Sequence, residues 1–271
     1  NRKYFINSTL LSYPISRNGK KMCGKFVSTK EKKTMAQTVL HTANTRGAAD
    51  HGWLKSFHSF SFAGYYNPDR IHFGALRVLN DDFVTGGMGF GEHPHDNMEI
   101  ISIPLEGELQ HKDSLGNTAT IKAGEIQVMS AGKGVYHSEY NPDAKSPAKF
   151  LQIWVFPNKR NVEPRYDQIT IDRDTRNEFV QVLSPNADDA GVWIYQDAWF
   201  NMGRFDANTS KTYQLHKEGN GAYIFVLSGS LKVAGQELNT RDGFGISETD
   251  QFEISASTDA EFLIMEVPMK F

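Results

Sequence analysis

The chain has 271 residues, of which 39% are hydrophobic and 23% charged, with 23 glycines and 10 prolines. These values predict a globular protein of one or two domains and exclude collagen-like, disordered and coiled-coil classes. Because no run of about 18 apolar residues occurs, we expect no membrane-spanning helix. The single cysteine, Cys23, excludes an intramolecular disulfide framework and any multi-cysteine zinc site.

The net charge of −3 conceals two segments of opposite sign. Residues 1–34 hold nine lysines and arginines against one glutamate, a charge of +8, so residues 35–271 carry −11. We expect residues 1–34 to be a basic leader outside the fold, with Met35 as the natural start. A transit-like or nucleic-acid-contacting arm is the alternative. The acidic body argues against direct nucleic-acid binding, which requires a basic footprint, and we expect a cytoplasmic protein.

From residue 70 onward, short apolar runs alternate with turns rich in Gly, Asn, Asp and Pro. This spacing is typical of all-β sandwiches and barrels. The segment Leu105–Leu109 resembles Leu227–Leu231, and matching glycine turns follow both. The repeat predicts two related β-barrels in tandem. We expect domains over 35–156 and 165–271, joined by the polar, proline-containing linker 157–164.

The strongest chemical signal is two pairs of potential metal ligands, His93 with His95 and His137 with Glu139. Residues i and i+2 of a strand face the same side, so each pair points one way. Two facing strands would then offer three imidazoles and one carboxylate, a set that suits Fe, Ni, Mn, Cu or Zn. The alternative is a hydrogen-bonded cluster in a β core.

Three further side chains leave alternatives open. Glu99 shares the parity of the first histidine pair if the strand continues unbroken. It is then a fourth ligand, a group that orients an imidazole, or a solvated residue. His111 either lines the mouth of the pocket or lies in a solvated loop. His216 is expected to be a surface or core histidine rather than a ligand.

The first domain resembles the cupins, whose two motifs it matches with Gly107 one residue late. The matching positions are Gly87, His93, His95, Glu99, Gly134, His137 and Asn141. More narrowly, residues 37–271 resemble the pirins, in particular bacterial pirin-like quercetin 2,3-dioxygenases. The motifs that carry this resemblance are His-Pro-His-x-x-x-Glu (93–99), Leu-Glu-Gly (105–107), Ala-Gly-x-Gly-x-x-His-Ser-Glu (131–139) and Tyr-Asn-Pro (140–142).

The resemblance implies two tandem cupin (jelly-roll) barrels, a bicupin, with one metal held by His93, His95, His137 and Glu139. It implies a divalent transition metal, Fe(II) first, with Ni, Mn, Cu, Co or Zn as alternatives. It also implies a dioxygenase that opens flavonols such as quercetin with O₂. For such a reaction we expect Glu139 to take the proton of the substrate hydroxyl while remaining near the metal. The alternative is an iron-binding regulatory pirin that binds a protein partner without turnover.

The C-terminal domain is expected to lack metal ligands. The offset between the two repeats places the counterparts of the four predicted ligands near non-matching residues, namely Leu215, Lys217, Ala256 and Thr258. We therefore expect this domain to serve packing or partner contacts.

Overall fold

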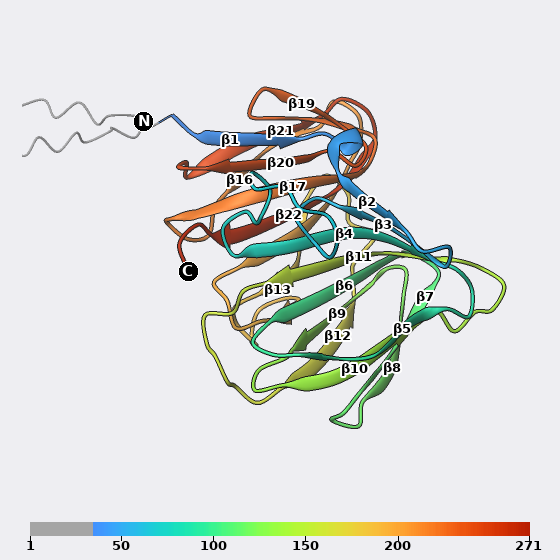
Figure 1. Ribbon diagram of the computed structural model, residues 1–271. Coiled ribbons are helices and arrows are strands. Elements are labelled where there is room, and N and C mark those ends of the chain that lie inside the picture. The colour runs from blue at the N-terminus through green and yellow to red at the C-terminus, as the bar shows by residue number, and fades with distance from the viewer. Residues whose placement is uncertain (1–34) are drawn as a thin grey trace, which may run out of the picture. The chain divides into compact units, whose positions relative to one another are not determined.

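The protein is described by a computed structural model that covers residues 35–271, and the predicted basic leader lies outside them. The described residues form 22 strands and one 3₁₀ turn, η1 (Ala43–Thr45). Four sheets pair into two barrels, each with a seven-stranded and a four-stranded sheet (Figure 1). The all-β, two-cupin prediction is confirmed. No helix of the described part is long and apolar enough to cross a membrane.

The first barrel combines a sheet in the order β12-β9-β6-β11-β4-β3-β2 with a second in the order β5-β10-β7-β8. Its strands are β2 (Gly47–Asp50), β3 (Leu54–His58), β4 (Leu76–Val84), β5 (Gly89–His95), β6 (Glu99–Glu106), β7 (Glu108–Asp113), β8 (Thr118–Lys122), β9 (Glu125–Ser130), β10 (Val135–Tyr140), β11 (Ala148–Val155) and β12 (Arg165–Thr170).

The second barrel repeats this arrangement, with sheets in the orders β1-β20-β17-β22-β15-β13-β14 and β16-β21-β18-β19. Its strands are β1 (Gln37–His41), β13 (Phe179–Ser184), β14 (Val192–Trp193), β15 (Trp199–Phe205), β16 (Ser210–Gln214), β17 (Asn220–Ser228), β18 (Ser230–Val233), β19 (Gln236–Asn239), β20 (Gly243–Ser247), β21 (Gln251–Ala256) and β22 (Ala260–Pro268).

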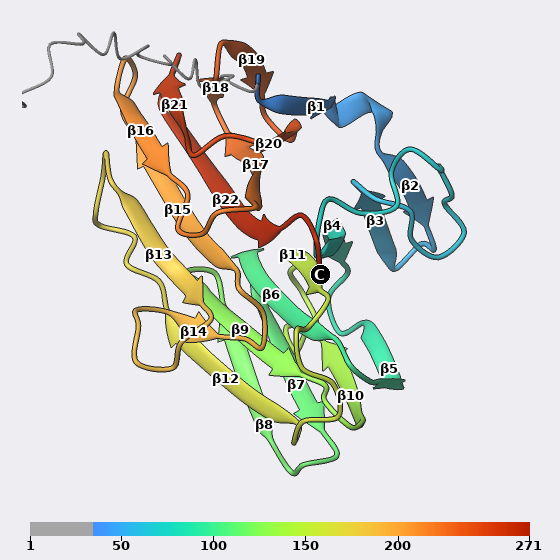
Figure 2. The same cartoon turned by 90° about the vertical axis from the view of Figure 1, so that its left-hand side faces the viewer.

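Two strands cross the division expected at 157–164. The first strand of the described chain, β1, pairs with β20 of the second barrel, and β12 pairs with β9 of the first barrel. Figure 2 shows β12 alongside β9 and β1 beside the C-terminal strands. Each barrel is therefore completed by a strand that the linear boundary assigned to the other.

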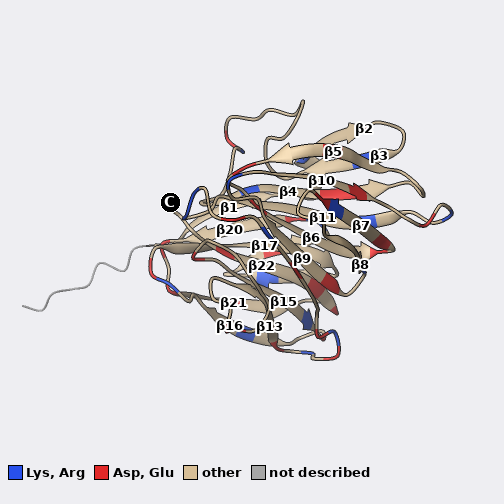
Figure 3. Cartoon of the chain, turned by 90° about the horizontal axis from the view of Figure 1, so that it is seen from below, with Lys and Arg blue, Asp and Glu red and all other residues tan. Residues whose placement is uncertain are grey.

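The largest apolar core lies between the two barrels, where their seven-stranded sheets meet. Ile101 and Ile103 of β6 pack there with residues of the second barrel such as Phe200 and Leu263. Alternate residues on the same strands face the barrel interiors, since side chains of a strand alternate between faces. Acidic and basic residues are interspersed along the chain in the view from below (Figure 3).

Candidate metal centre

Three of the predicted ligands meet inside the first barrel. Strands β5 and β10 pair antiparallel, with His93 directly opposite His137. The imidazole centroids of His93 and His137 lie 4.5 Å apart, and each lies 4.8–4.9 Å from that of His95. One nitrogen from each ring lies within 4.8 Å of the other two. The i, i+2 argument thus placed these side chains correctly relative to one another.

Glu139 belongs to a second, overlapping triad. A carboxylate oxygen of Glu139 lies within 4.8 Å of ring nitrogens of His137 and His111, and all three residues are buried. Glu139 is the cross-strand partner of His111 on β7, while the register with β5 shifts between His137 and Glu139. His137 therefore links an outer cluster of three histidines to an inner carboxylate.

Polar side chains of the large sheet form hydrogen bonds with the carboxylate of Glu139. Gln127 Nε2 donates to its Oε1 at 3.0 Å, and Gln152 Nε2 donates to its Oε2 at 2.8 Å. Ser102 Oγ lies 3.1 Å from Oε1. These partners belong to a polar belt that crosses the inner face of the large sheet. The belt consists of Tyr166 and Gln127, Ser102, Gln152, Asn80 and Asp82, and Ser56 and His58 on successive strands.

A chain of hydrogen bonds sets the proton positions of two histidines. Asp113 Oδ2 lies 3.0 Å from His111 Nε2 and, when ionised, accepts its proton, so His111 Nδ1 keeps a lone pair. His137 Nδ1 lies 3.4 Å from His111 Nδ1 and donates its proton to that lone pair. His137 Nε2 is left as a buried lone pair with no hydrogen-bond partner. In the same way, His93 Nδ1 donates to the Gly91 carbonyl at 2.7 Å, which frees His93 Nε2.

Burial and mutual proximity keep the imidazoles of His95 and His137 neutral. Burial, reinforced by His93, lowers the pKa of His95 to about 4 and that of His137 to about 2. Burial also raises the pKa of the Glu139 carboxyl, against opposing contributions from His111 and from the hydrogen bonds of Gln152 and Ser102. Neutral imidazoles offer the lone pairs that a transition metal binds. The orphaned Nε2 of His137 and the nitrogen-rich donor set therefore fit a divalent transition ion.

Glu99 lies on the other face of the large sheet, because the strand does not continue unbroken and the condition for shared parity with His93 and His95 is not met. Strand β5 ends at His95, the chain turns through Asn97 at a positive φ of 45°, and β6 begins at Glu99. Glu99 pairs with Val155, which belongs to the core between the barrels. Its Oε2 accepts from Ser130 Oγ at 2.6 Å.

His111 was underestimated by sequence reasoning, because its ring is fully buried rather than solvated. It stacks on Tyr166 with ring centroids 4.6 Å apart. The sequence did contain a signal. His111 and Asp113 follow Leu109 at intervals of two, so an inward Leu109 predicts an inward His111 and Asp113.

The second barrel carries different side chains at the matching positions. Repeat alignment sets His111 against Val233, whose cross-strand partner is Ile254. Ile254 then matches Glu139, and the pair formed by Tyr213 and Phe252 matches that of His93 and His137. The full set is Tyr213, Leu215, Phe252 and Ile254, so the offset-based positions were two residues out for the first pair and four for the second. The segments between the matched strands differ in length between the two barrels, and an offset taken from the repeat does not follow these differences.

His216, expected on the surface or in the core, is partly buried. Its Nδ1 lies 2.8 Å from Glu266 Oε2, and its ring stacks on Trp199 with centroids 4.9 Å apart. Glu266 also accepts hydrogen bonds from Tyr213 and Asn220. His216 thus takes part in a satisfied polar network.

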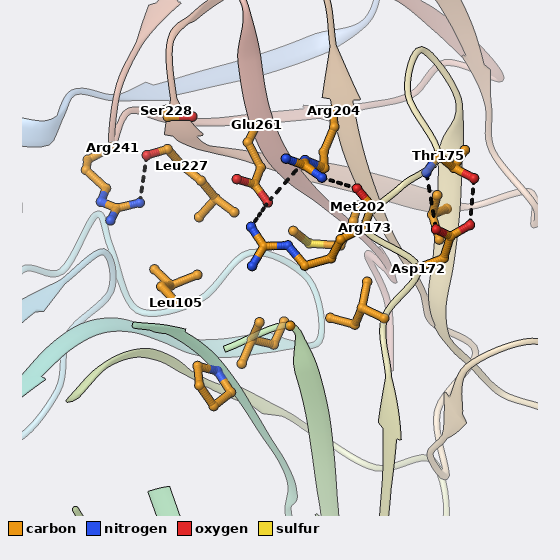
Figure 4. A pocket seen from close by; sticks show the side chains of 15 residues that line it. Leu105, Asp172, Arg173, Thr175, Met202, Arg204, Leu227, Ser228, Arg241 and Glu261 are labelled. Carbon is orange, nitrogen blue, oxygen red and sulfur yellow. Dashed lines mark hydrogen bonds and ion pairs between the residues drawn. The ribbon is translucent and has the colours of Figure 1, made fainter. Parts of the chain in front are cut away.

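A cavity of about 180 Å³ lies away from the histidines, between the two large sheets. Its apolar walls include Leu105 and Met202. Figure 4 shows Arg173 and Arg204 directed at Glu261, at 3.4 and 4.0 Å. Both arginines are therefore paired within the wall of this cavity.

Comparison with known proteins agrees with this geometry. The family model described as Pirin matches residues 39–155, and the model of the quercetinase C-terminal cupin domain matches 181–267. A quercetin 2,3-dioxygenase from Escherichia coli K12 is 41% identical over 229 residues, which cover 84% of this chain and 98% of that protein. The chain belongs to the pirin family.

Other pirins support the same relationship. A pirin-like protein from Caulobacter vibrioides is 40% identical over 222 residues, covering 81% of this pirin and 95% of its own length. The crystal structure of the bacterial pirin YhhW from Escherichia coli in complex with nickel(II) superposes with a TM-score of 0.81 at 40% identity. The match covers 86% of this pirin and 99% of that chain.

Proposed function

We propose that this pirin is a metal-dependent dioxygenase that opens flavonols such as quercetin with O₂. The observation that carries the proposal is the cluster of three imidazoles beside a buried carboxylate in one barrel. The names of its relatives supply the reaction class. A divalent ion, Fe(II) first and Ni(II) or another transition ion as alternatives, would be held by His93, His95, His137 and Glu139. Once bound, it would supply Lewis-acid and redox chemistry to the flavonol and O₂.

The protein side chains have defined tasks in this scheme. His93 and His137 present Nε2 because their Nδ1 atoms are engaged elsewhere. Glu139 receives the hydroxyl proton of the flavonol, and its raised pKa makes it the stronger base for that transfer. The Gln127 and Gln152 amides donate hydrogen bonds to the carboxylate. These contacts orient the side chain as it takes up the proton.

The test combines elemental analysis with O₂ uptake. Chelator-free protein is expected to hold close to one transition metal per chain, and metal-loaded protein should consume O₂ and release CO with quercetin. His93→Ala should lose both metal and activity, whereas His216→Gln in the second barrel should keep both. Metal retention without O₂ consumption by any loaded form would reject turnover and favour the regulatory alternative. A pull-down with and without iron would then search for the partner.

A further inference from the structure

Three buried polar atoms without a hydrogen-bond partner lie on one stretch of the first barrel's inner wall. They are His58 Nδ1, Asn80 Oδ1 and Trp154 Nε1. His58 and Asn80 are each only 2% exposed. Buried polar groups of native proteins are nearly always paired, and an unpaired one requires an explanation. Three on neighbouring strands point to a common partner.

The strand register shows that these atoms share one face. His58 on β3 is the cross-strand partner of Asn80 on β4, and Asn80 is the partner of Gln152 on β11. Gln152 contacts Glu139, so this face is the one that holds the histidine cluster. Trp154 follows Gln152 by two residues and therefore faces the same interior.

Aromatic contacts connect this stretch to the candidate metal centre. The Trp154 ring lies 5.0 Å from that of His95, between centroids. Phe62 contacts both ends of the stretch, with its centroid 5.4 Å from Trp154 and 5.3 Å from His58. A planar aromatic ligand with one end at the histidines would thus extend along a wall of rings.

The hydrogen-bonding character of each atom follows from its neighbours. Trp154 Nε1–H is a donor and Asn80 Oδ1 is an acceptor. Ser56 Oγ donates its only proton to Asp82, so it accepts from His58 Nε2 at 2.8 Å. His58 Nδ1 is therefore a second acceptor. One donor beside two acceptors is complementary to hydroxyl groups, which both donate and accept.

We propose that His58, Asn80 and Trp154 form a subsite that binds the hydroxyl groups of a polyhydroxylated aromatic substrate. The inference rests on the proposed function, which places the metal-directed end of the flavonol at the histidine cluster. It adds that hydroxyls remote from that end donate to Asn80 and His58 and accept from Trp154. The subsite would make substrate choice depend on the pattern of ring hydroxyls.

The test measures binding without turnover. Nickel-loaded protein is titrated anaerobically by calorimetry with quercetin and with 3-hydroxyflavone, which keeps the metal-directed hydroxyl but lacks the others. Trp154→Phe keeps an aromatic ring but removes the indole N–H. Asn80→Leu removes the acceptor oxygen at a similar side-chain size. Each is expected to weaken quercetin binding about tenfold and to leave 3-hydroxyflavone within about twofold. The variants lie on different strands, so one decides the test if the other does not fold.

The chain offers a matched control. Asn201 on β15 is the cross-strand partner of Ile264, just as Asn80 is the partner of Gln152. The second barrel therefore carries an asparagine at the position that matches Asn80. Asn201→Leu should leave both affinities unchanged. The subsite is rejected, while the flavonol site stands, if Trp154→Phe and Asn80→Leu weaken the binding of both ligands equally. The same conclusion follows if they weaken the binding of neither ligand. If the wild type binds neither flavonol, both proposals are overturned.

Discussion

The Nδ1 atoms of His111 and His137 lie 3.4 Å apart, and Asp113 anchors the far nitrogen of His111. A carboxylate thus acts on a candidate metal ligand through an intervening imidazole. Partners that fix the tautomer of a ligating histidine are worth about 10–100-fold in metal affinity. The relationship makes His111 a positioning residue.

The first prediction concerns this link. His111→Leu should weaken Ni(II) affinity about 10–100-fold, because His137 Nδ1 loses its acceptor. His111→Gln, whose side-chain oxygen can accept the same proton, should recover much of that loss. Competition with a chromogenic chelator measures the affinities, and the ligand-field spectrum of the Co(II)-loaded protein counts bound imidazoles. A spectrum showing that His111→Gln has lost one bound imidazole would make His111 a ligand instead.

The second prediction concerns Glu139 as proton acceptor. Glu139→Gln keeps the size of the side chain and one of its two acceptor oxygens but removes its basicity. We expect kcat with quercetin to fall about 10²–10⁴-fold. Glu106→Gln, a change at an exposed glutamate at the end of β6, is the control. The rates are compared at equal bound metal, and an unchanged kcat at equal occupancy would contradict the assignment.

The third prediction concerns stability and pH. Burial raises the pKa of Glu99 to about 7, from an ordinary value of 4.5. The folded state therefore holds this proton more tightly than the unfolded state does. Its contribution, on the order of 3 kcal/mol, is fully present below pH 4.5 and is lost as the pH rises through about 7. In Glu99→Gln the side chain is neutral at every pH, so this variant should not lose stability from this position as the pH rises.

Thermal melts of chelator-treated protein at pH 5 and pH 8 check this sign. The melting temperature of Glu99→Gln relative to wild type should be higher at pH 8 than at pH 5. The exposed control Glu106→Gln should show the same difference at both values. A relative melting temperature that does not depend on pH would mean that Glu99 stays ionised in the fold.

The fourth prediction concerns the division between the barrels. A fragment of residues 35–156 lacks β12 and exposes the face of β6 that carries Ile101 and Ile103. We expect it to aggregate, because an open edge strand and a large apolar face are both association sites. Size-exclusion chromatography and near-ultraviolet circular dichroism test this. A monomeric fragment with a cooperative melt would show that the first barrel folds alone.

Sequence reasoning succeeded where the evidence was local. The alternation in His93 and His95, and in His137 and Glu139, depends only on strand geometry, and the structure brings these side chains into one barrel. The face on which Glu99 lies could not be predicted in this way, because the chain leaves the strand conformation at 96–98 and the alternation starts again at Glu99. The amide partners of Glu139 come from separate strands, and only the sheet order brings them together.

The pairing of β1 with β20 has a consequence for synthesis. Of the described strands, β1 leaves the ribosome first, whereas β20 emerges only after the strands from β2 to β19 have been translated. Throughout most of elongation β1 therefore has no strand to pair with. Emergence of β20, rather than closure of the first barrel, is the event that completes the β1–β20 edge.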